Sequence, residues 1–483
     1  MAAYAFSTVS STTGTYSTTY KSSRVSVMSS ELDLAPHLSR VDLWSWLEDD
    51  EEKVTKIERT KRLVKEFCHG GDGDIGALVE RWLSEVGVGW VRDLSDDPSA
   101  GTSSLLRTQP QRNSLTEKWI RALTLLEGHF AKGEQDAPAL VQLARFVEAA
   151  VLKMLPFVDA LLLASADPDA ATDTAADATN GAQAPSEREL QTLLDVRDAV
   201  FSTSEGIQLV FKSCDCDSLV EMEAQRSSVE VLSLLSAKKQ RLDEVVWNTM
   251  EEVRTSILNN DDDNEWGIQT RQGSPDICKV TRSLVTYIKC LTVDYWRVNS
   301  IVRTAAKLGN YVPPHNKTDP VYTLMVDTVS SLQVRLAKRS ESFPDHSLRF
   351  LFLINNTQFI WQQLHSLYRI KYHVATLTPK IEDYIQKYLQ VSWEPVLSCL
   401  HNDTPRCFRT NSALPKFDSE FQKIYTAQKL WKVPDPKLRT RLREAIVEKV
   451  VSGLTSYLED NNVTNPGVTP QEREEMLMEL FEG

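Results

Sequence analysis

The stretch from Leu414 to Asp435 constrains the fold most, because its large side chains recur at steps of three and four residues. That spacing places them on one face of an α-helix. The residues on this face are Phe417, Phe421, Ile424, Tyr425, Gln428 and Trp431. A helix face with this much aromatic surface has to pack against other parts of the chain. The stretch therefore predicts a helix within a packed helical assembly.

A second helix is expected immediately after this stretch. Pro434 has no N–H to donate, and Asp435 can lie beside the N-terminus of the next helix, where negative charge is favoured. The sequence that follows repeats apolar residues at helical spacing. These residues are Leu438, Leu442, Ala445, Ile446 and Val450. We expect them to form the buried stripe of this second helix.

Basic residues gather around the start of the second helix. From position 429 to position 443 the chain has six basic residues and one acid, a local charge of +5 in a chain of net charge −13. The six are Lys429, Lys432, Lys437, Arg439, Arg441 and Arg443. On composition alone, a solvated helix face is the first interpretation of such a run. A binding surface for an anionic partner is the second interpretation.

The rest of the chain has the same helical character. Only 18 of its 483 residues are glycine, and long stretches have neither Gly nor Pro, which favours helices over a turn-rich β fold. Further helices are expected at residues 41–69, 75–86, 140–164, 187–212, 218–259, 276–308, 321–340, 346–377, 379–400 and 470–480, and after a capping box at Ser114 and Glu117. No stretch shows sustained strand alternation. The predicted fold is all-α, with consecutively stacked helical bundles.

Changes in composition suggest five regions. Residues 1–35 form a Ser/Thr-rich tail that cannot bury a core and is expected to be disordered, and residues 167–186 are a low-complexity linker rich in Ala, Asp and Thr. Between and after them we expect an N-terminal helical bundle at 36–166, a middle bundle at 187–345 and a C-terminal bundle with the basic helix at 346–483.

Several short patterns that could carry chemistry are better explained as loops. Gly71-x-Gly73-x-x-Gly76 follows a predicted helix instead of a strand, and the acidic run that begins at Asp261 has Trp266 where a calcium loop needs glycine. The seven cysteines are expected to be reduced thiols, and no segment has enough apolar sequence for a membrane span. We predict no catalytic residues, no metal ligands and no cofactor, and therefore a protein that is not an enzyme.

Several ordered motifs in the second half of the chain resemble the Exo-seventy family of exocyst subunits in its plant form. They are Trp247–Leu258 (WNTMEEVRTSIL), Leu348–Asn356 (LRFLFLINN), Trp393–Leu400 (WEPVLSCL), Phe417-x-x-x-Phe421, Tyr425-x-x-Gln428-x-x-Trp431, Val433-Pro434-Asp435 with Leu438-Arg439, and Leu480–Gly483 (LFEG). The resemblance covers roughly residues 116–483.

The resemblance implies an elongated rod of stacked α-helical bundles and a non-enzymatic role in exocytosis. In that role the protein tethers secretory vesicles to the plasma membrane, and it is cytoplasmic and peripheral at that membrane. The implied partners are the other exocyst subunits, phosphatidylinositol 4,5-bisphosphate, and small Rho-type GTPases or receptor kinases, with no nucleic acid. The implied lipid-binding residues are the six basic residues between Lys429 and Arg443.

The sequence also departs from the family pattern. The segment Asn465–Pro470 (NPGVTP) lacks the lysines that family members carry there, Val451–Leu454 (VSGL) replaces a Pro-Ala-Tyr pattern, and the N-terminal coiled-coil arm has no counterpart. These departures favour an alternative: a divergent interaction adaptor in plant defence signalling or autophagy that has lost exocyst assembly and lipid binding.

Overall fold

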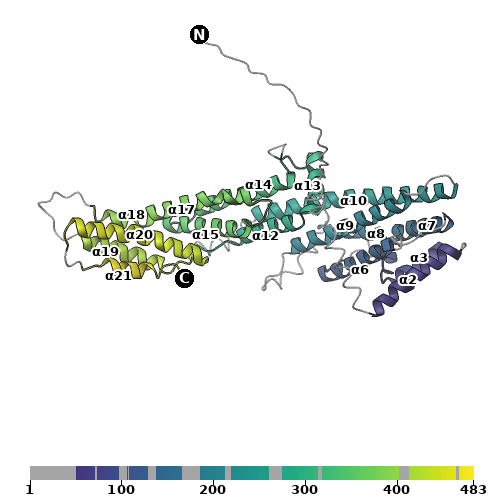
Figure 1. Ribbon diagram of the computed structural model, residues 1–483, viewed down its shortest axis with the longest axis horizontal. Coiled ribbons are helices and arrows are strands. Elements are labelled where there is room, and N and C mark those ends of the chain that lie inside the picture. Colours follow the sequence, from purple (N-terminus) through teal and green to yellow (C-terminus); the bar gives the residue numbers. More distant parts are fainter. Residues whose placement is uncertain are drawn as a thin grey trace, which may run out of the picture. The chain divides into compact units, whose positions relative to one another are not determined.

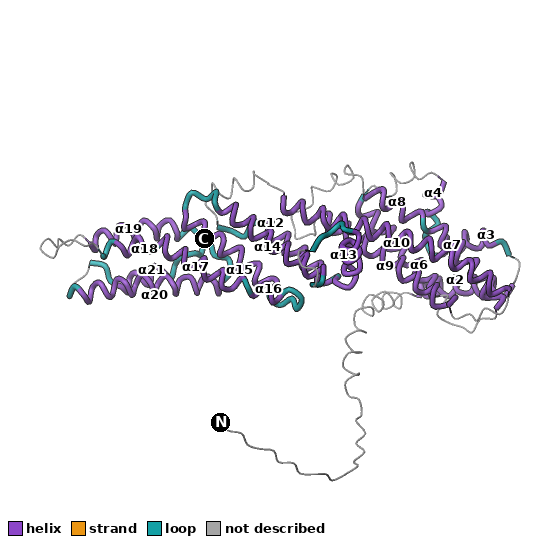
Figure 2. Tube along the Cα trace, turned by 90° about the horizontal axis from the view of Figure 1, so that it is seen from above, coloured by secondary structure: helices purple, strands orange, loops and turns teal. Residues whose placement is uncertain are grey.

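The structure is a computed structural model that describes residues 51–70, 73–96, 106, 108–128, 137–165, 185–212, 219–259, 275–313, 318–401, 413–463 and 467–483. The chain divides into two compact units, residues 1–62 and Leu63–Gly483, and the second contains nearly all the described residues. The described elements are helices, and the β pairing among the described residues is one isolated bridge between Lys432 and Glu482 (Figures 1 and 2). The predicted all-α fold is confirmed.

The first helices of the second unit enclose an aromatic core. Helix α2 (Glu51–Gly70) enters this unit at Leu63 and is followed by α3 (Ile75–Glu85), α4 (Val91–Asp96), α6 (Gln109–Gly128), α7 (Ala137–Met154) and α8 (Pro156–Ser165). Trp82 of α3 meets Phe146 of α7 edge to face, with ring centroids 5.7 Å apart. Trp119 of α6 is fully buried, and its indole N–H donates to the Met154 carbonyl at 3.0 Å. The buried indole therefore has the partner that its N–H requires.

Two long helices connect the first helices of the second unit to the helices that follow. Helix α9 (Pro185–Lys212) lies along α10 (Leu219–Asn259), and the pair also contacts α6 and α7. Helix α10 then meets α12 (Lys279–Val293), α13 (Tyr295–Leu308) and α14 (Pro320–Ser340). Each helix thus packs mainly on helices that are near it in the sequence.

The last helices follow α15 (His346–Leu364). They are α16 (Lys371–Ala375), α17 (Leu377–Ser392), α18 (Glu394–Ser398), α19 (Ala413–Gln428), α20 (Pro436–Asp460) and α21 (Pro470–Leu477). Every side chain of α15 from Leu351 to Thr357 is buried, because α12, α14 and α17 surround the helix. Among the described residues, none of the helices combines the length and apolar character that crossing a bilayer requires.

Asn355 and Asn356 of α15 are buried polar residues that join three segments. The Asn356 Oδ1 accepts from the Cys278 N–H at 3.0 Å and from the Thr281 hydroxyl at 2.7 Å. The Asn355 Nδ2 donates to the Pro275 carbonyl at 2.8 Å and to the Lys432 carbonyl at 3.1 Å. These amides tie the entry to α12 and the connection between α19 and α20 to the same helix.

Several predicted helices are shorter than expected. The helix expected at 140–164 breaks at Leu155, because Pro156 lacks the N–H that would continue the ladder. The helix expected at 276–308 is broken by a turn at Asp294, and the helices expected at 346–377 and 379–400 are interrupted at residues 365–370 and at Trp393. Helix α6 begins at Gln109, so Ser114 lies inside it and the predicted capping box was wrong. Pro110 is tolerated in its first turn, where an N–H has no helical acceptor.

Part of the predicted domain organisation lies outside the described residues. This applies to the tail at 1–35 and to positions 167–184 of the linker, whereas positions 185 and 186 begin α9. The acidic run at Asp261 is outside the described residues as well. The division into three bundles stays a prediction.

Candidate functional site

The aromatic stripe that the sequence predicted lies on α19 and is buried. Phe417 and Phe421 are fully covered, and the rings of Phe417, Phe421 and Tyr425 follow one another at centroid distances of 6.0 and 6.1 Å. The Gln428 side chain accepts a hydrogen bond from the buried Tyr388 hydroxyl of α17. Ile424 is only partly buried, and Trp431 is buried just after the helix ends. The stripe anchors the start of the basic stretch in the core.

Asp435 caps α20 as expected. Its Oδ1 accepts from the Leu438 N–H at 2.7 Å, and its Oδ2 accepts from the Gln362 amide of α15 at 2.6 Å. The predicted apolar stripe of α20 is buried at Leu438, Leu442, Ile446 and Val450, and Ala445 is partly buried. The cap and the stripe fix which way the basic side chains of this helix project.

The last residues of the chain pack beside the basic stretch. Leu480 and Phe481 are fully buried, and the Val433 N–H donates to the Phe481 carbonyl at 3.2 Å. Phe481 has φ of 69°, a left-handed conformation that a bulky residue adopts only when its surroundings hold it there. Burial of the ring and the bridge between Lys432 and Glu482 provide that restraint.

This packing brings carboxylates to the basic side chains. The Lys429 ammonium lies 2.7 Å from Glu479 and 3.1 Å from the Tyr425 hydroxyl. Hydrogen bonds from Lys429 and Tyr425 lower the pKa of the Glu479 carboxyl, and the same contact with Glu479 raises the pKa of Lys429. A salt bridge of this kind leaves less net positive charge for an anionic partner.

The arginines of α20 are paired in the same way. Arg443 donates to Glu482 at 2.7 Å and to the Leu480 carbonyl at 2.8 Å, and Arg439 pairs with the same Glu482 carboxylate. The hydrogen bond from Arg443 lowers the pKa of Glu482. Arg441 pairs with Glu382 of α17. The Arg443 side chain is only 12% exposed, so it is largely covered and not the solvated group that the helical pattern indicated.

Lys432 and Lys437 are different from the other four basic residues. Both are exposed, and neither forms an ion pair with a residue that the structure describes. Sequence reasoning missed the neutralising residues Glu382, Glu479 and Glu482. The only signal available was that Glu482 belongs to the terminal LFEG motif. Together with Asp435, these three carboxylates reduce the local charge from +6 for the cations alone to +2.

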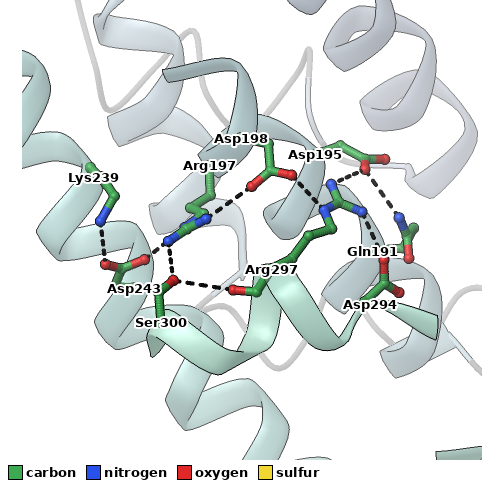
Figure 3. Close-up of polar contacts among 9 residues, drawn as sticks. All are labelled: Gln191, Asp195, Arg197, Asp198, Lys239, Asp243, Asp294, Arg297 and Ser300. Atoms are coloured by element: carbon green, nitrogen blue, oxygen red, sulfur yellow. Dashed lines mark hydrogen bonds and ion pairs between the residues drawn. The ribbon is translucent and has the colours of Figure 1, made fainter. Parts of the chain in front are cut away.

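A second polar cluster joins α9, α10 and α13 (Figure 3). The buried Arg197 donates to Asp243 at 2.9 Å, to Asp198 at 3.0 Å and to the Ser300 hydroxyl at 2.5 Å. Lys239 also forms an ion pair with Asp243, and Arg297 forms ion pairs with Asp195, Asp198 and Asp294. The Gln191 amide donates a hydrogen bond to Asp195. Burial raises the pKa of Asp195, although Arg297 opposes that shift. Each charge has an opposite charge beside it, so the cluster serves to join helices.

Comparison with known proteins places this chain among helical exocyst subunits. The family model for the C-terminal part of the Exo70 exocyst complex subunit matches residues 169–476. Among curated relatives from Arabidopsis thaliana, exocyst complex component EXO70E2 is 27% identical over 42% of this chain and 34% of its own length. Component EXO70A3 is 22% identical over 60% of this chain and 49% of its own length. The chain spans about half or less of the length of these relatives.

A solved structure also aligns with this chain. The crystal structure of the Saccharomyces cerevisiae exocyst component Exo70p aligns with 92% of this chain and 99% of its own, at 13% identity and a TM-score of 0.37. The family assignment rests on the family model, which spans more than half of the chain. The chain belongs to the Exo70 family of exocyst subunits through the C-terminal region that this model describes.

Proposed function

We propose that this protein is a non-enzymatic scaffold that helps to tether secretory vesicles to the plasma membrane as a subunit of an exocyst complex. The observation that carries the proposal is the family match over residues 169–476, which contains every helix from α9 to α20. Most of the large apolar side chains of these helices are buried in the core, so partners would contact the polar outer faces. In this role the protein works in the cytoplasm and at the inner face of the membrane.

Anionic lipid is the second part of the proposal. A Lys or Arg near an anionic leaflet contributes about 1 kcal/mol. Lys432 and Lys437 would contribute most, since they have no ion pair among the described residues, whereas Lys429, Arg439, Arg441 and Arg443 are already paired. The structure therefore supports a weak lipid contact that assists protein scaffolding.

Two experiments test the two parts separately. In a pull-down with the other exocyst subunits, recovery of those subunits supports the tether, and their absence removes it. In a sedimentation assay, vesicles with phosphatidylinositol 4,5-bisphosphate should retain the protein better than neutral vesicles. The variant Lys432→Glu/Lys437→Glu should lose that preference, and Lys416→Glu, an exposed change on α19, should keep it. Equal retention by both kinds of vesicle would rule out the lipid contact and leave the exocyst part of the proposal standing.

A different function is favoured by the carboxylates beside the basic residues. A chain whose basic stretch is largely neutralised internally suits an interaction adaptor in plant defence signalling or autophagy that has lost lipid binding and exocyst assembly. Affinity purification separates the two functions. Recovery of receptor kinases or small Rho-type GTPases without exocyst subunits supports the adaptor, and recovery of exocyst subunits supports the tether.

A further inference from the structure

Exposed aromatic rings and cations meet where α13 begins and where α15 is connected to α16. Trp296 in the first turn of α13 is 57% exposed, and Tyr368 and Tyr372 are 76% and 74% exposed. Arg369 and Lys371 lie between the two tyrosines in the sequence. We call these five residues the aromatic–cation surface. Single exposed apolar residues are common, but a group of exposed rings around cations marks a candidate interaction site.

Arg369 is held in place by two rings. Its guanidinium carbon lies 3.3 Å from the centroid of the Tyr295 ring and 5.3 Å from that of Trp296. The Tyr295 ring is buried and meets Trp296 edge to face at 5.4 Å, and its hydroxyl donates to Asp319. Burial and the neighbouring Asp319 raise the pKa of Tyr295 to about 12, which keeps this donor protonated. The guanidinium is therefore oriented before any partner arrives, which lowers the entropy cost of binding.

Lys371 is placed in a similar way. Its ammonium lies 4.8 Å from the Tyr368 ring centroid and 5.0 Å from that of Tyr372. Neither the Lys371 ammonium nor the Arg369 guanidinium has an ion pair or a hydrogen bond with a residue that the structure describes, whereas the cations in the cluster of Figure 3 all do. Two cations that lie on aromatic rings and have no carboxylate partner among the described residues form a positive surface on a chain of net charge −13.

We propose that the aromatic–cation surface binds an acidic segment of a partner protein. A guanidinium stacked on a ring keeps its N–H edges free, and these edges match the two oxygens of a carboxylate. The edges of Trp296, Tyr368 and Tyr372 would contact apolar side chains of the same segment, and Trp, Tyr and Arg are the residues that dominate binding energy at protein interfaces. A membrane fits less well, because lipid-binding surfaces cluster about four to eight cations and this surface has two.

The test starts with selection from a displayed library of random short peptides on the intact chain. Peptides that also bind the Lys371→Glu/Trp296→Ala variant are subtracted. The proposal expects the remaining peptides to be rich in Asp and Glu with at least one large apolar residue. Enrichment of neutral or basic sequences, or no difference between the chain and the variant, would overturn it.

The best peptide is then synthesised with a fluorescent label, and its binding is measured by anisotropy. Lys371→Glu and Trp296→Ala should each weaken binding about tenfold or more. The matched changes Lys307→Glu and Leu308→Ala, both at exposed positions at the end of α13, should leave binding unchanged. Circular dichroism confirms that every variant is folded. Equal weakening by both pairs of variants would mean that the attraction is non-specific and would overturn the proposal. Displacement of the peptide by anionic but not by neutral vesicles would mean that this surface binds a membrane instead of a protein.

Discussion

Arg443 on α20 donates a hydrogen bond of 2.7 Å to the carboxylate of Glu482, which lies 39 positions later in the chain. The same carboxylate also pairs with Arg439. The basic stretch and the last residues of the chain therefore form one electrostatic unit, and the charge that a partner meets depends on both.

Removing the acidic partners should strengthen attraction to anionic vesicles. The double change Glu479→Gln/Glu482→Gln leaves Lys429, Arg439 and Arg443 without their ion pairs. Removing the two carboxylates adds two units of net positive charge, each worth about 1 kcal/mol near an anionic leaflet, so binding should rise about fivefold for each carboxylate removed. Co-sedimentation with anionic vesicles measures the change, and the gain should shrink as salt is added.

The control for this measurement is Glu459→Gln, which removes an exposed acid near the end of α20. This change should leave vesicle binding within about twofold. Glu459 lies at the opposite end of α20 from the basic residues, and salt screens its charge over that distance. An equal gain in both variants would mean that total charge, rather than the pairing, sets the attraction.

Acid should weaken the attachment of the last residues. Hydrogen bonds from Lys429 and Arg443 lower the pKa values of Glu479 and Glu482 below the ordinary 4.5. In the folded chain these carboxyls hold their protons less tightly than in the unfolded chain, so their stabilisation is complete above 4.5 and is lost as the pH falls through the lower folded-state values. The thermal midpoint, followed as a function of pH, should therefore fall less in Glu479→Gln/Glu482→Gln than in Glu459→Gln. Parallel curves for the two variants would contradict this assignment.

Asp243→Asn should destabilise the junction of α9, α10 and α13. Asp243 is 7% exposed and faces the buried guanidinium of Arg197 at 2.9 Å. Breaking a buried ion pair costs about 3–5 kcal/mol, and we expect the lower end, because Asp198 and Ser300 remain beside Arg197. Urea unfolding measures the loss. Asp383→Asn, which breaks the exposed pair with Lys387, should cost less than about 1 kcal/mol, and a similar loss in both variants would argue against a buried role for Asp243.

Asn356→Ala should destabilise the entry to α12. The change removes the acceptor of the buried Cys278 N–H and of the Thr281 hydroxyl. A buried group left without a hydrogen bond costs about 1–3 kcal/mol. Hydrogen exchange at the Cys278 amide should also become faster, since its protection depends on this bond. The change Asn299→Ala, at a partly exposed position on α13, removes one acceptor of Arg303 and should stay within about 0.5 kcal/mol. Unchanged exchange at Cys278 would show that another group replaces Asn356.

Sequence reasoning succeeded where the signal was local. The buried faces of α19 and α20 and the cap at Asp435 follow from residues three or four positions apart, and the structure confirms them. It failed at Asp294, where the chain turns with neither Gly nor Pro nearby, and it overlooked Pro395, which ends the preceding helix at Trp393 and lies in the first turn of α18. The turn at Asp294 lets α13 pack on α10 and α14, and local propensity does not encode that packing.

The amino-acid sequence by itself determined that this chain is all-α, which faces of its helices are buried and to which family it is similar, because helical periodicity and motifs are read from neighbouring positions. Only the tertiary structure decided what the charged side chains do. Glu479 and Glu482 neutralise cations of the basic stretch, and Tyr295 with Trp296 holds Arg369 from another connection. Coulomb and cation–π interactions depend on distances through space, and folding sets those distances between residues that are remote along the chain.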